Sequence, residues 1–339
     1  MQLSALLGVS AAATGMGLGK VRAESETITL SNYGGDAIKA YTEAWGDPFK
    51  ADTGITVAID GSGPLLGRVK KMVDDGLVSW DVTDVAPYYG LQLGADYAEK
   101  IDYSVVDESK FFPWNKNEFA AGNYVYSSVL AYDSSKFDQA PTSWVDFFDL
   151  KKFPGKRAMY KWFDGQPESC LLGAGKSMNE IYPMDMKVVA EMIGSLGDNL
   201  VLWDSGAVSQ QLFLDGEVVM GNLWNTRARQ LERDTNGRVT WIWDQQIVQP
   251  AAWLIPKGSK HVAAAQKFIA STQNVERQIK LLELMGNGPA NPETLNHLTQ
   301  EQKRLNPTSH LDVALAQDSE WYAANYNDAL DAWTEAVDG

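Results

Sequence analysis

The sequence has few of the residues on which metal and thiol chemistry depend. Cys170 is its single cysteine, so no disulfide can form within the chain. Its three histidines, His261, His297 and His310, stand far apart in sequence and lack the spacing of a metal site. The nucleophile elbow Gly-x-Ser-x-Gly and the zinc motif His-Glu-x-x-His are both absent. The sequence therefore gives no support for catalysis, and we expect neither an enzyme nor a metal or other cofactor.

Positive charge is also scarce. The chain holds 29 Lys and Arg against 44 Asp and Glu, which gives a net charge of −15. Such a protein is repelled by nucleic acids and by anionic membrane surfaces, so we expect neither as a partner. Hydrophobic residues make up 45% of the chain, as in a folded globular protein. The 12 Trp and 13 Tyr are numerous enough to suggest aromatic contacts with a ligand as well as a core.

Long apolar runs are limited to residues 3–18, a stretch too short and too interrupted to span a bilayer as a mature helix. The run ends in Val21-Arg22-Ala23, a site typical of signal-peptidase cleavage, which would leave Glu24 as the mature start. We therefore predict a signal peptide over residues 1–23 and an exported, soluble protein in the periplasm. Since that segment contains two basic and no acidic residues, cleavage would lower the net charge to −17.

Apolar periodicity predicts alternating strands and helices. Strands over residues 28–30, 55–59 and 81–85 are separated by helices over 37–53 and 65–75, which predicts a parallel sheet with right-handed crossovers. A second α/β unit follows, and no flexible linker separates the two. Its expected strands are 124–132, 158–160, 199–203, 218–223, 239–243 and 252–256, and its expected helices are 142–148, 168–177, 185–196, 205–214, 261–270 and 274–284.

Small or aromatic residues follow each strand of the first unit. Tyr33-Gly34-Gly35 comes after the first strand, Gly61-Ser62-Gly63 after the second and Tyr88-Tyr89 after the third. Because the carboxyl ends of parallel strands meet at one edge of a sheet, these three loops should lie side by side. Their convergence predicts a ligand site at that edge.

Residues 203–229 carry further candidate ligand contacts. Trp224 and Arg227 follow an expected strand, at the edge where an open sheet binds ligands. The indole offers apolar or cation–π contact, and the guanidinium suits a carboxylate. Ser205 and Gln210 could add hydrogen bonds from the first turns of a neighbouring helix. The alternatives are a core tryptophan, a surface arginine and a plain helix cap at Ser205.

A series of short segments along the chain carries a resemblance to a known family. The segments are Tyr33-Gly34-Gly35, residues 49–57, residues 84–89, Lys100-Ile101-Asp102, residues 141–146, residues 215–218, Trp224-Asn225, residues 255–258 and residues 288–292. In this order the sequence resembles the periplasmic solute-binding proteins of ABC transporters, in the spermidine/putrescine-binding branch that includes binders of polyamines and 4-aminobutyrate. The likeness runs over nearly all of residues 27–300.

The resemblance implies an α/β fold of two lobes, with a central sheet in each lobe, a strand hinge and an interlobe ligand cleft. It implies a discontinuous first lobe of residues 24–131 and 252–310, and a second lobe of residues 132–251. Residues 311–339 would form a C-terminal helical segment that packs on the lobes. The expected partners are a small-molecule ligand and an ABC permease in the inner membrane, and we expect a monomer.

The resemblance also guides the choice of ligand. The family's ligand-binding tryptophan corresponds to Trp224, but its second acidic anchor falls on residues 249–253, where Ala251 is the nearest match and no acid stands. Arg227 adds a positive charge that disfavours a polycation in a closed cleft. We therefore expect a small carboxylate with an amine or quaternary-ammonium end, such as a zwitterion similar to 4-aminobutyrate. The expected ligand-binding residues are Tyr33, Gly34, Tyr88, Ser205, Trp224, Arg227 and Gln249.

Two alternative functions remain open from the sequence. Putrescine or spermidine could bind instead, served by Asp36, Asp164 or Asp204. A secreted hydrolase or lyase on the same two-lobed scaffold is the more distant alternative, and turnover of a bound ligand would reveal it.

Overall fold

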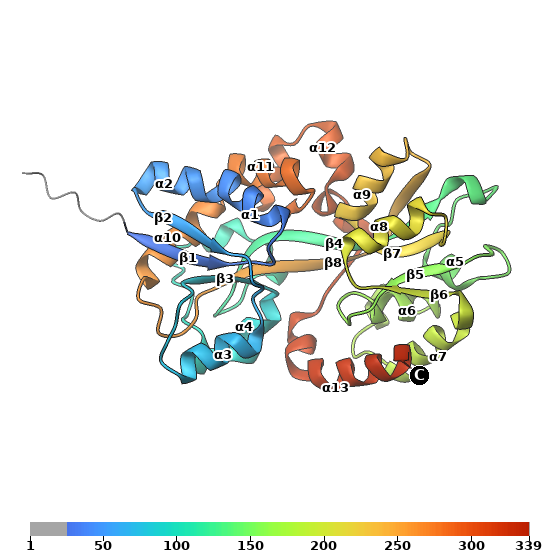
Figure 1. Ribbon diagram of the computed structural model, residues 1–339, viewed down its shortest axis with the longest axis horizontal. Coiled ribbons are helices and arrows are strands. Elements are labelled where there is room, and N and C mark those ends of the chain that lie inside the picture. Colours follow the sequence, from blue (N-terminus) through green and yellow to red (C-terminus); the bar gives the residue numbers. More distant parts are fainter. Residues whose placement is uncertain (1–25, 339) are drawn as a thin grey trace, which may run out of the picture.

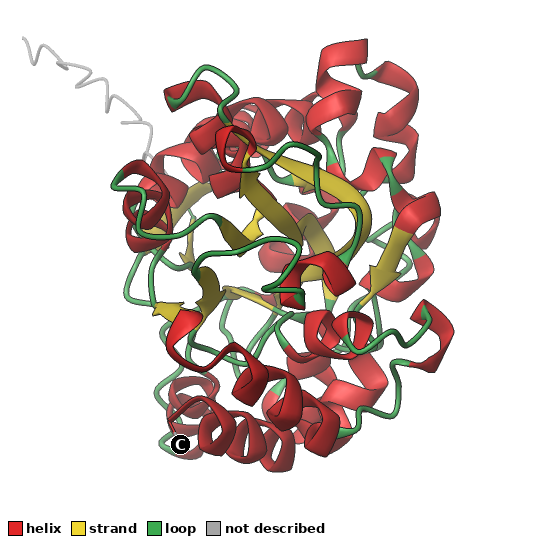
Figure 2. Ribbon diagram, turned by 90° about the vertical axis from the view of Figure 1, so that its right-hand side faces the viewer, coloured by secondary structure: helices red, strands yellow, loops and turns green. Residues whose placement is uncertain are grey.

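The computed structural model describes residues 26–338 as two lobes joined by long strands (Figure 1). The predicted signal peptide, residues 1–23, lies outside the described residues. A single mixed sheet of ten strands runs through both lobes in the order β2-β1-β3-β8-β4-β7-β5-β6, with β10 beside β8 and β9 beside β4. Helices cover both faces of this sheet (Figure 2). Among the described residues, no helix combines the length and apolarity that a membrane crossing needs.

The first lobe contains the predicted parallel strands. β1 (Thr27–Ser31) pairs in parallel with β2 (Thr56–Asp60) on one side and with β3 (Val82–Val85) on the other. The predicted helix 37–53 is present as α1 and α2, joined by a π-helical turn at Thr42–Gly46. The helices of this lobe are α1 (Asp36–Tyr41), α2 (Asp47–Thr53), α3 (Leu66–Asp74), α4 (Pro87–Tyr97), α10 (Val262–Thr272) and α11 (Val275–Met285).

The second lobe has its own parallel strands. β5 (Arg157–Tyr160) lies between β6 (Leu200–Trp203) and β7 (Met220–Trp224). β7 begins two residues later than predicted and ends on Trp224, which is also the N-cap of α9. The helices of this lobe are α5 (Trp144–Phe148), α6 (Pro167–Gly173), α7 (Met186–Leu196), α8 (Gly206–Leu214) and α9 (Asn225–Asp234).

Two long antiparallel strands connect the lobes. β4 (Ala121–Asp133) and β8 (Val239–Leu254) pair along most of their length. Periodicity predicted two separate strands at 239–243 and 252–256, but the structure has one strand of 16 residues because the polar segment between them also pairs with β4. β8 pairs with β3 in the first lobe, and β4 pairs with β7 in the second. The sheets of the two lobes are therefore continuous.

The C-terminal part of the chain crosses between the lobes. α12 (Gln300–Leu305) leads to β10 (Ala314–Ala316), which pairs in parallel with β8. The last helix, α13 (Ser319–Asp338), packs on α4 of the first lobe and on α7 of the second (Figure 1).

The loop after β1 is held against the loop after β2, as the strand-end rule predicted. The backbone N–H of Gly63 donates to the carbonyl of Asn32 at 3.1 Å. Gly34 has φ +77°, and a Cβ there would stand 2.6 Å from the carbonyl oxygen of Gly61. Only glycine meets both conditions without strain.

We expect Gly34→Ala to lower the free energy of unfolding by about 1–3 kcal/mol. A Cβ at this position would strain the left-handed backbone and clash with the carbonyl oxygen of Gly61. Gly67→Ala is the matched control, because a Cβ at Gly67 meets nothing within 4 Å and the residue lies in α3. It should raise stability by about 0.5–1 kcal/mol. Urea unfolding followed by tryptophan fluorescence measures both, and equal effects of the two substitutions would contradict the expectation.

Candidate functional site

Asp164 lies where the two lobes meet. It follows β5 in the second lobe, and its Oδ1 atom accepts a hydrogen bond of 2.8 Å from the hydroxyl of Tyr88. Tyr88 is buried near the start of α4, just beyond the carboxyl end of β3 in the first lobe. The hydrogen bond therefore joins the two sheet edges at which a ligand is expected.

Tyrosine side chains surround this carboxylate. Burial raises the pKa of each of them, and the negative charge of Asp164 raises it further because a second anion would be repelled. They come from the loop after β1, from α4, from β4, from the end of β5 and from α13. We call these tyrosines and Asp164 the Asp164 cluster: Tyr33, Tyr88, Tyr89, Tyr126, Tyr160, Tyr322 and Tyr326.

Tyr33 is the exposed residue of the cluster. Its side chain is 63% exposed, although the protein atoms around its hydroxyl raise the pKa of that group. Asp84 of the first lobe and Asp164 of the second raise this pKa further, because a second anion near them would be repelled. The Tyr33 hydroxyl therefore lies near acidic groups of both lobes.

The charge of Asp164 is not compensated by a cation. No Lys, Arg or His forms an ion pair with it in the part of the chain that the structure describes. Burial raises the pKa of Asp164, and the hydrogen bond from Tyr88 opposes that rise. A cationic group next to Asp164 would stabilise the carboxylate and lower its pKa. The cluster is therefore suited to an ammonium group.

Trp224 belongs to an aromatic group beside the Asp164 cluster. Its ring centroid lies 5.0 Å from that of Tyr160, 5.0 Å from that of Trp203 and 6.5 Å from that of Tyr126. Tyr160, Trp203 and Trp224 are the last residues of β5, β6 and β7, so they gather at the carboxyl edge of the second sheet. Their faces and edges give an apolar surface next to Asp164.

Arg227 lies between the first turns of α8 and α9. Its Nη1 atom donates to Oε1 of Gln210 at 3.2 Å, and a Cβ at Gly206 would stand 2.2 Å from its Nε atom. This Nε atom is buried without a hydrogen-bond partner, and Arg227 forms no ion pair with a described carboxylate. Arg227 thus keeps donor capacity for an anion at the amino ends of two helices.

Two other expected site residues have structural roles in the described chain. Ser205 is the N-cap of α8, and its hydroxyl accepts from the N–H of Val208 at 3.4 Å. Gly34 allows the close contact with Gly61 that holds Tyr33 in its loop. Both residues lie just beyond strand ends, Gly34 after β1 and Ser205 after β6.

Gln249 supports the loop that carries Asp164. Its Nε2 atom donates to the hydroxyl of Ser128 at 2.8 Å, and its Oε1 atom is buried without a partner. A Cβ at Gly165 would stand 2.3 Å from Gln249 Nε2, so the amide packs directly under the residue that follows Asp164. Asn222 adds a hydrogen bond of 3.3 Å to the carbonyl of Gly165.

The structure brings two of the acids proposed for a polyamine near the same tyrosine. Asp164 and Asp204 both raise the pKa of the Tyr160 hydroxyl, whereas Asp36 is the exposed first residue of α1. Sequence reasoning missed Tyr126 and Tyr160 as neighbours of Asp164. The strand-end rule could have found Tyr160, whereas Tyr126 lies inside β4 and comes close only through the pairing of β4 with β8, where it stands opposite Gln249.

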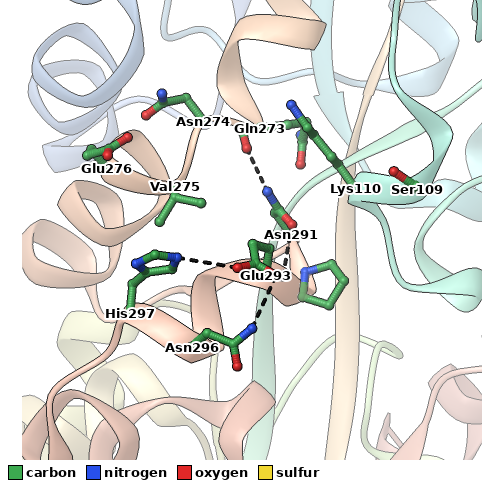
Figure 3. A pocket seen from close by; sticks show the side chains of 11 residues that line it. Ser109, Lys110, Gln273, Asn274, Val275, Glu276, Asn291, Glu293, Asn296 and His297 are labelled. Atoms are coloured by element: carbon green, nitrogen blue, oxygen red, sulfur yellow. Dashed lines mark hydrogen bonds and ion pairs between the residues drawn. The ribbon is translucent and has the colours of Figure 1, made fainter.

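A surface pocket of about 650 Å³ lies elsewhere (Figure 3). It opens between Glu108–Lys110, the start of α11 and Pro292–His297. Its polar walls bond to one another, since Asn291 Nδ2 donates to the carbonyl of Gln273 at 2.8 Å. No residue of the Asp164 cluster lines it, so it is separate from the site described above.

Comparisons with known proteins agree with this architecture. Residues 44–308 match the sequence profile of the family described as bacterial extracellular solute-binding protein. The gamma-aminobutyric acid-binding protein of Pseudomonas aeruginosa is 31% identical over 311 residues, which cover 89% of this chain and 88% of that protein.

Solved structures give the same result. A structure described as a GABA receptor has a TM-score of 0.87 at 31% identity and covers 92% of this chain and 98% of its own. An ABC transporter substrate-binding protein from Bradyrhizobium japonicum has a TM-score of 0.86 at 29% identity and covers 92% of this chain and 99% of its own.

These findings confirm the resemblance and the two-lobed α/β fold that the sequence predicted. They also confirm the expected location outside the cytoplasmic membrane, because the matched family is extracellular and is periplasmic in bacteria with two membranes. The profile covers well over half of the chain, and the relative is similar along nearly its whole length. The chain belongs to the family of bacterial extracellular solute-binding proteins.

Proposed function

We propose that this protein is the substrate-binding component of an ABC importer and captures a small zwitterion similar to 4-aminobutyrate between its lobes. The relatives named as binding gamma-aminobutyric acid support this ligand class. The observation that carries the proposal concerns two side chains of opposite charge, Asp164 and Arg227. Neither forms an ion pair with another described residue. They follow the adjacent strands β5 and β7.

Arg227 would hold the carboxylate of the ligand. Its half-buried guanidinium bonds Gln210 through Nη1, and a carboxylate can accept two parallel hydrogen bonds from such a group. The amino ends of α8 and α9, capped by Ser205 and Trp224, would add favourable dipoles for an anion. Ser205 is thereby proposed as a contact as well as a cap.

Asp164 would hold the ammonium group. The hydroxyl of Tyr88 already bonds its Oδ1 atom, and an ammonium can donate to the same carboxylate while it touches the rings of the cluster. Tyr33 would close over this end, since its side chain is exposed and its hydroxyl lies near Asp164. Gln249 would keep the Asp164 loop in place through Gly165.

The apolar stem of the ligand would lie on Trp224 and Tyr160. Their ring centroids are 5.0 Å apart, and Asp164 acts on the Tyr160 hydroxyl. Arg227 is three residues beyond Trp224, so it lies near the same side of the chain one helical turn further on. A short chain with an ammonium at one end and a carboxylate at the other matches this order of groups.

Putrescine is the second candidate, and the uncompensated charge of Asp164 favours it. A second ammonium of a diamine would have to lie near Arg227, where two positive charges repel. Spermidine carries still more charge. We therefore place the zwitterion first.

The lobe boundaries form part of the proposal. Residues 24–131 with 252–310 would move against residues 132–251 about β4 and β8, and residues 311–339 would pack on both. Hinge closure would present the liganded shape to a permease in the inner membrane. We propose that the protein acts as a monomer, without nucleic acid and without turnover of its ligand.

Arg227→Ala should weaken binding of 4-aminobutyrate by about 10- to 100-fold, because a charge-assisted hydrogen-bonded contact with the carboxylate is lost. Arg233→Ala is the matched control, since Arg233 is exposed on the same helix. It should change the affinity less than twofold. Isothermal titration calorimetry with 4-aminobutyrate and putrescine measures both variants, and tight putrescine binding that survives Arg227→Ala would refute the carboxylate role.

Affinity for 4-aminobutyrate should fall as the pH drops through the pKa of Asp164. Because burial raises that pKa, the fall should begin at a higher pH than for an exposed aspartate. The sign follows from charge: the ammonium binds the deprotonated carboxylate, which is present above the pKa and lost below it. Calorimetry between about pH 4 and pH 8 measures the profile.

Asp164→Asn tests the assignment of that profile. It should weaken binding by tenfold or more and remove the fall, whereas Glu168→Gln should leave the fall in place although the pKa of Glu168 is raised by burial to about 7. An unchanged profile in Asp164→Asn would show that another group titrates.

The absence of turnover is tested by mass spectrometry. 4-Aminobutyrate incubated with a stoichiometric amount of protein should be recovered intact after prolonged incubation. Conversion of the ligand that depends on folded protein would establish a hydrolase or lyase instead.

A further inference from the structure

The C-terminal helix contacts the loop that carries Asp164. Three aromatic residues of α13 make these contacts, and their spacing of four and seven residues places them on one face of the helix. They are Trp333, whose indole donates to the carbonyl of Lys161 at 2.9 Å, Tyr326, which lies edge-on to Phe163 at 5.7 Å, and Tyr322, whose hydroxyl donates to Oε1 of Glu168 at 2.8 Å.

The same helix also contacts the first lobe. The ring of Tyr326 stacks on that of Tyr88, with centroids 5.5 Å apart and planes at 26°. Its centroid lies 6.4 Å from that of Tyr89, and Gln92 Nε2 donates to the carbonyl of Ala323 at 3.4 Å. Tyr326 is therefore packed between α4 of the first lobe and Phe163 of the second.

Tyr326 stands beside the carboxylate on two grounds. Tyr88, on which it stacks, donates a hydrogen bond to Asp164, and Phe163, which it also contacts, precedes Asp164 in the chain. In agreement, burial and the charge of Asp164 both raise the pKa of Tyr326. The ring of Tyr326 is half-buried at this place.

We propose that α13 forms one wall of the ammonium subsite and that Tyr326 restricts this subsite to an unsubstituted ammonium group. The proposal rests on the proposed function, because it assigns the ammonium to Asp164. A primary ammonium is small and donates three hydrogen bonds, which Asp164 and the surrounding hydroxyls can accept. A trimethylammonium has no donor and needs additional volume on the side that Tyr326 fills.

The test compares 4-aminobutyrate with its N,N,N-trimethyl derivative. Calorimetry on the full chain would give both dissociation constants for the unmodified protein, Tyr326→Ala, Tyr326→Phe and Trp321→Ala. Trp321→Ala is the matched control because Trp321 is an aromatic residue of the same helix that packs on Tyr182, with ring centroids 5.6 Å apart.

We expect the unmodified protein to prefer 4-aminobutyrate by about tenfold or more, a ratio typical of extra methyl groups at a fitted pocket. Tyr326→Ala should reduce this preference by about tenfold, while Tyr326→Phe, which keeps the ring, and Trp321→Ala should retain it. A folded Tyr326→Ala protein with an unchanged preference would overturn the proposal, as would a preference of the unmodified protein for the trimethyl compound.

A ligand-free measurement separates this proposal from the proposed function. If the unmodified protein binds neither compound, the proposed function fails. Hydrogen–deuterium exchange of residues 161–168 then tests separately whether α13 packs on and stabilises the Asp164 loop. Faster exchange in Tyr326→Ala than in Trp321→Ala would indicate that Tyr326 of α13 stabilises the Asp164 loop. Equal exchange would overturn it.

Discussion

The half-buried carboxylate of Asp164 is the constraint on which the proposed site depends. An acidic group taken out of water must be hydrogen-bonded, paired with a cation or protonated. Its side chain accepts a hydrogen bond from Tyr88, and no described Lys, Arg or His forms an ion pair with it. In the function proposed above, the positive charge would come from the ligand. Since Tyr88 and Asp164 belong to different lobes, their hydrogen bond also joins the lobes.

The continuous sheet explains how such a contact can form and break. β4 and β8 carry the chain between the lobes as paired strands, and the proposed hinge motion would bend them. The Asp164 loop packs on these strands, because Gly165 lies against Gln249 of β8 and Ser128 of β4. A hinge motion of this kind would therefore move Asp164 with the strands. α13 adds a second connection, made of ring contacts that can separate more easily than a strand ladder.

The sequence predicted the parts of the fold that depend on local pattern. Alternating periodicity located the main strands of both lobes. The strand-end rule predicted that Tyr33, Tyr88 and Trp224 lie at the carboxyl edges of the sheet, because each stands at or within a few residues of the end of a strand. The lobe boundaries and ligand contacts drawn from the resemblance stay predictions. The pattern could not show that Tyr126 reaches Asp164 from inside β4, or that Tyr326 does so from the far end of the chain, since both depend on tertiary packing. It also divided β8 in two, because a polar stretch that pairs on both sides lacks the apolar signal of a strand.

The choice between a zwitterion and a diamine follows from the order of charges along the second sheet. The acid Asp164 follows the last residue of β5, Tyr160, and the base Arg227 follows the last residue of the adjacent β7, Trp224. A zwitterion would place its ammonium at Asp164 and its carboxylate at Arg227. Each protein charge would then reduce the free-energy cost of burying the ligand group that it faces. A diamine would pair with Asp164 but would bring its second positive charge near Arg227. In the proposed site, Asp164 favours one end of a polyamine and Arg227 opposes its other end, so the site would discriminate by charge as well as by shape.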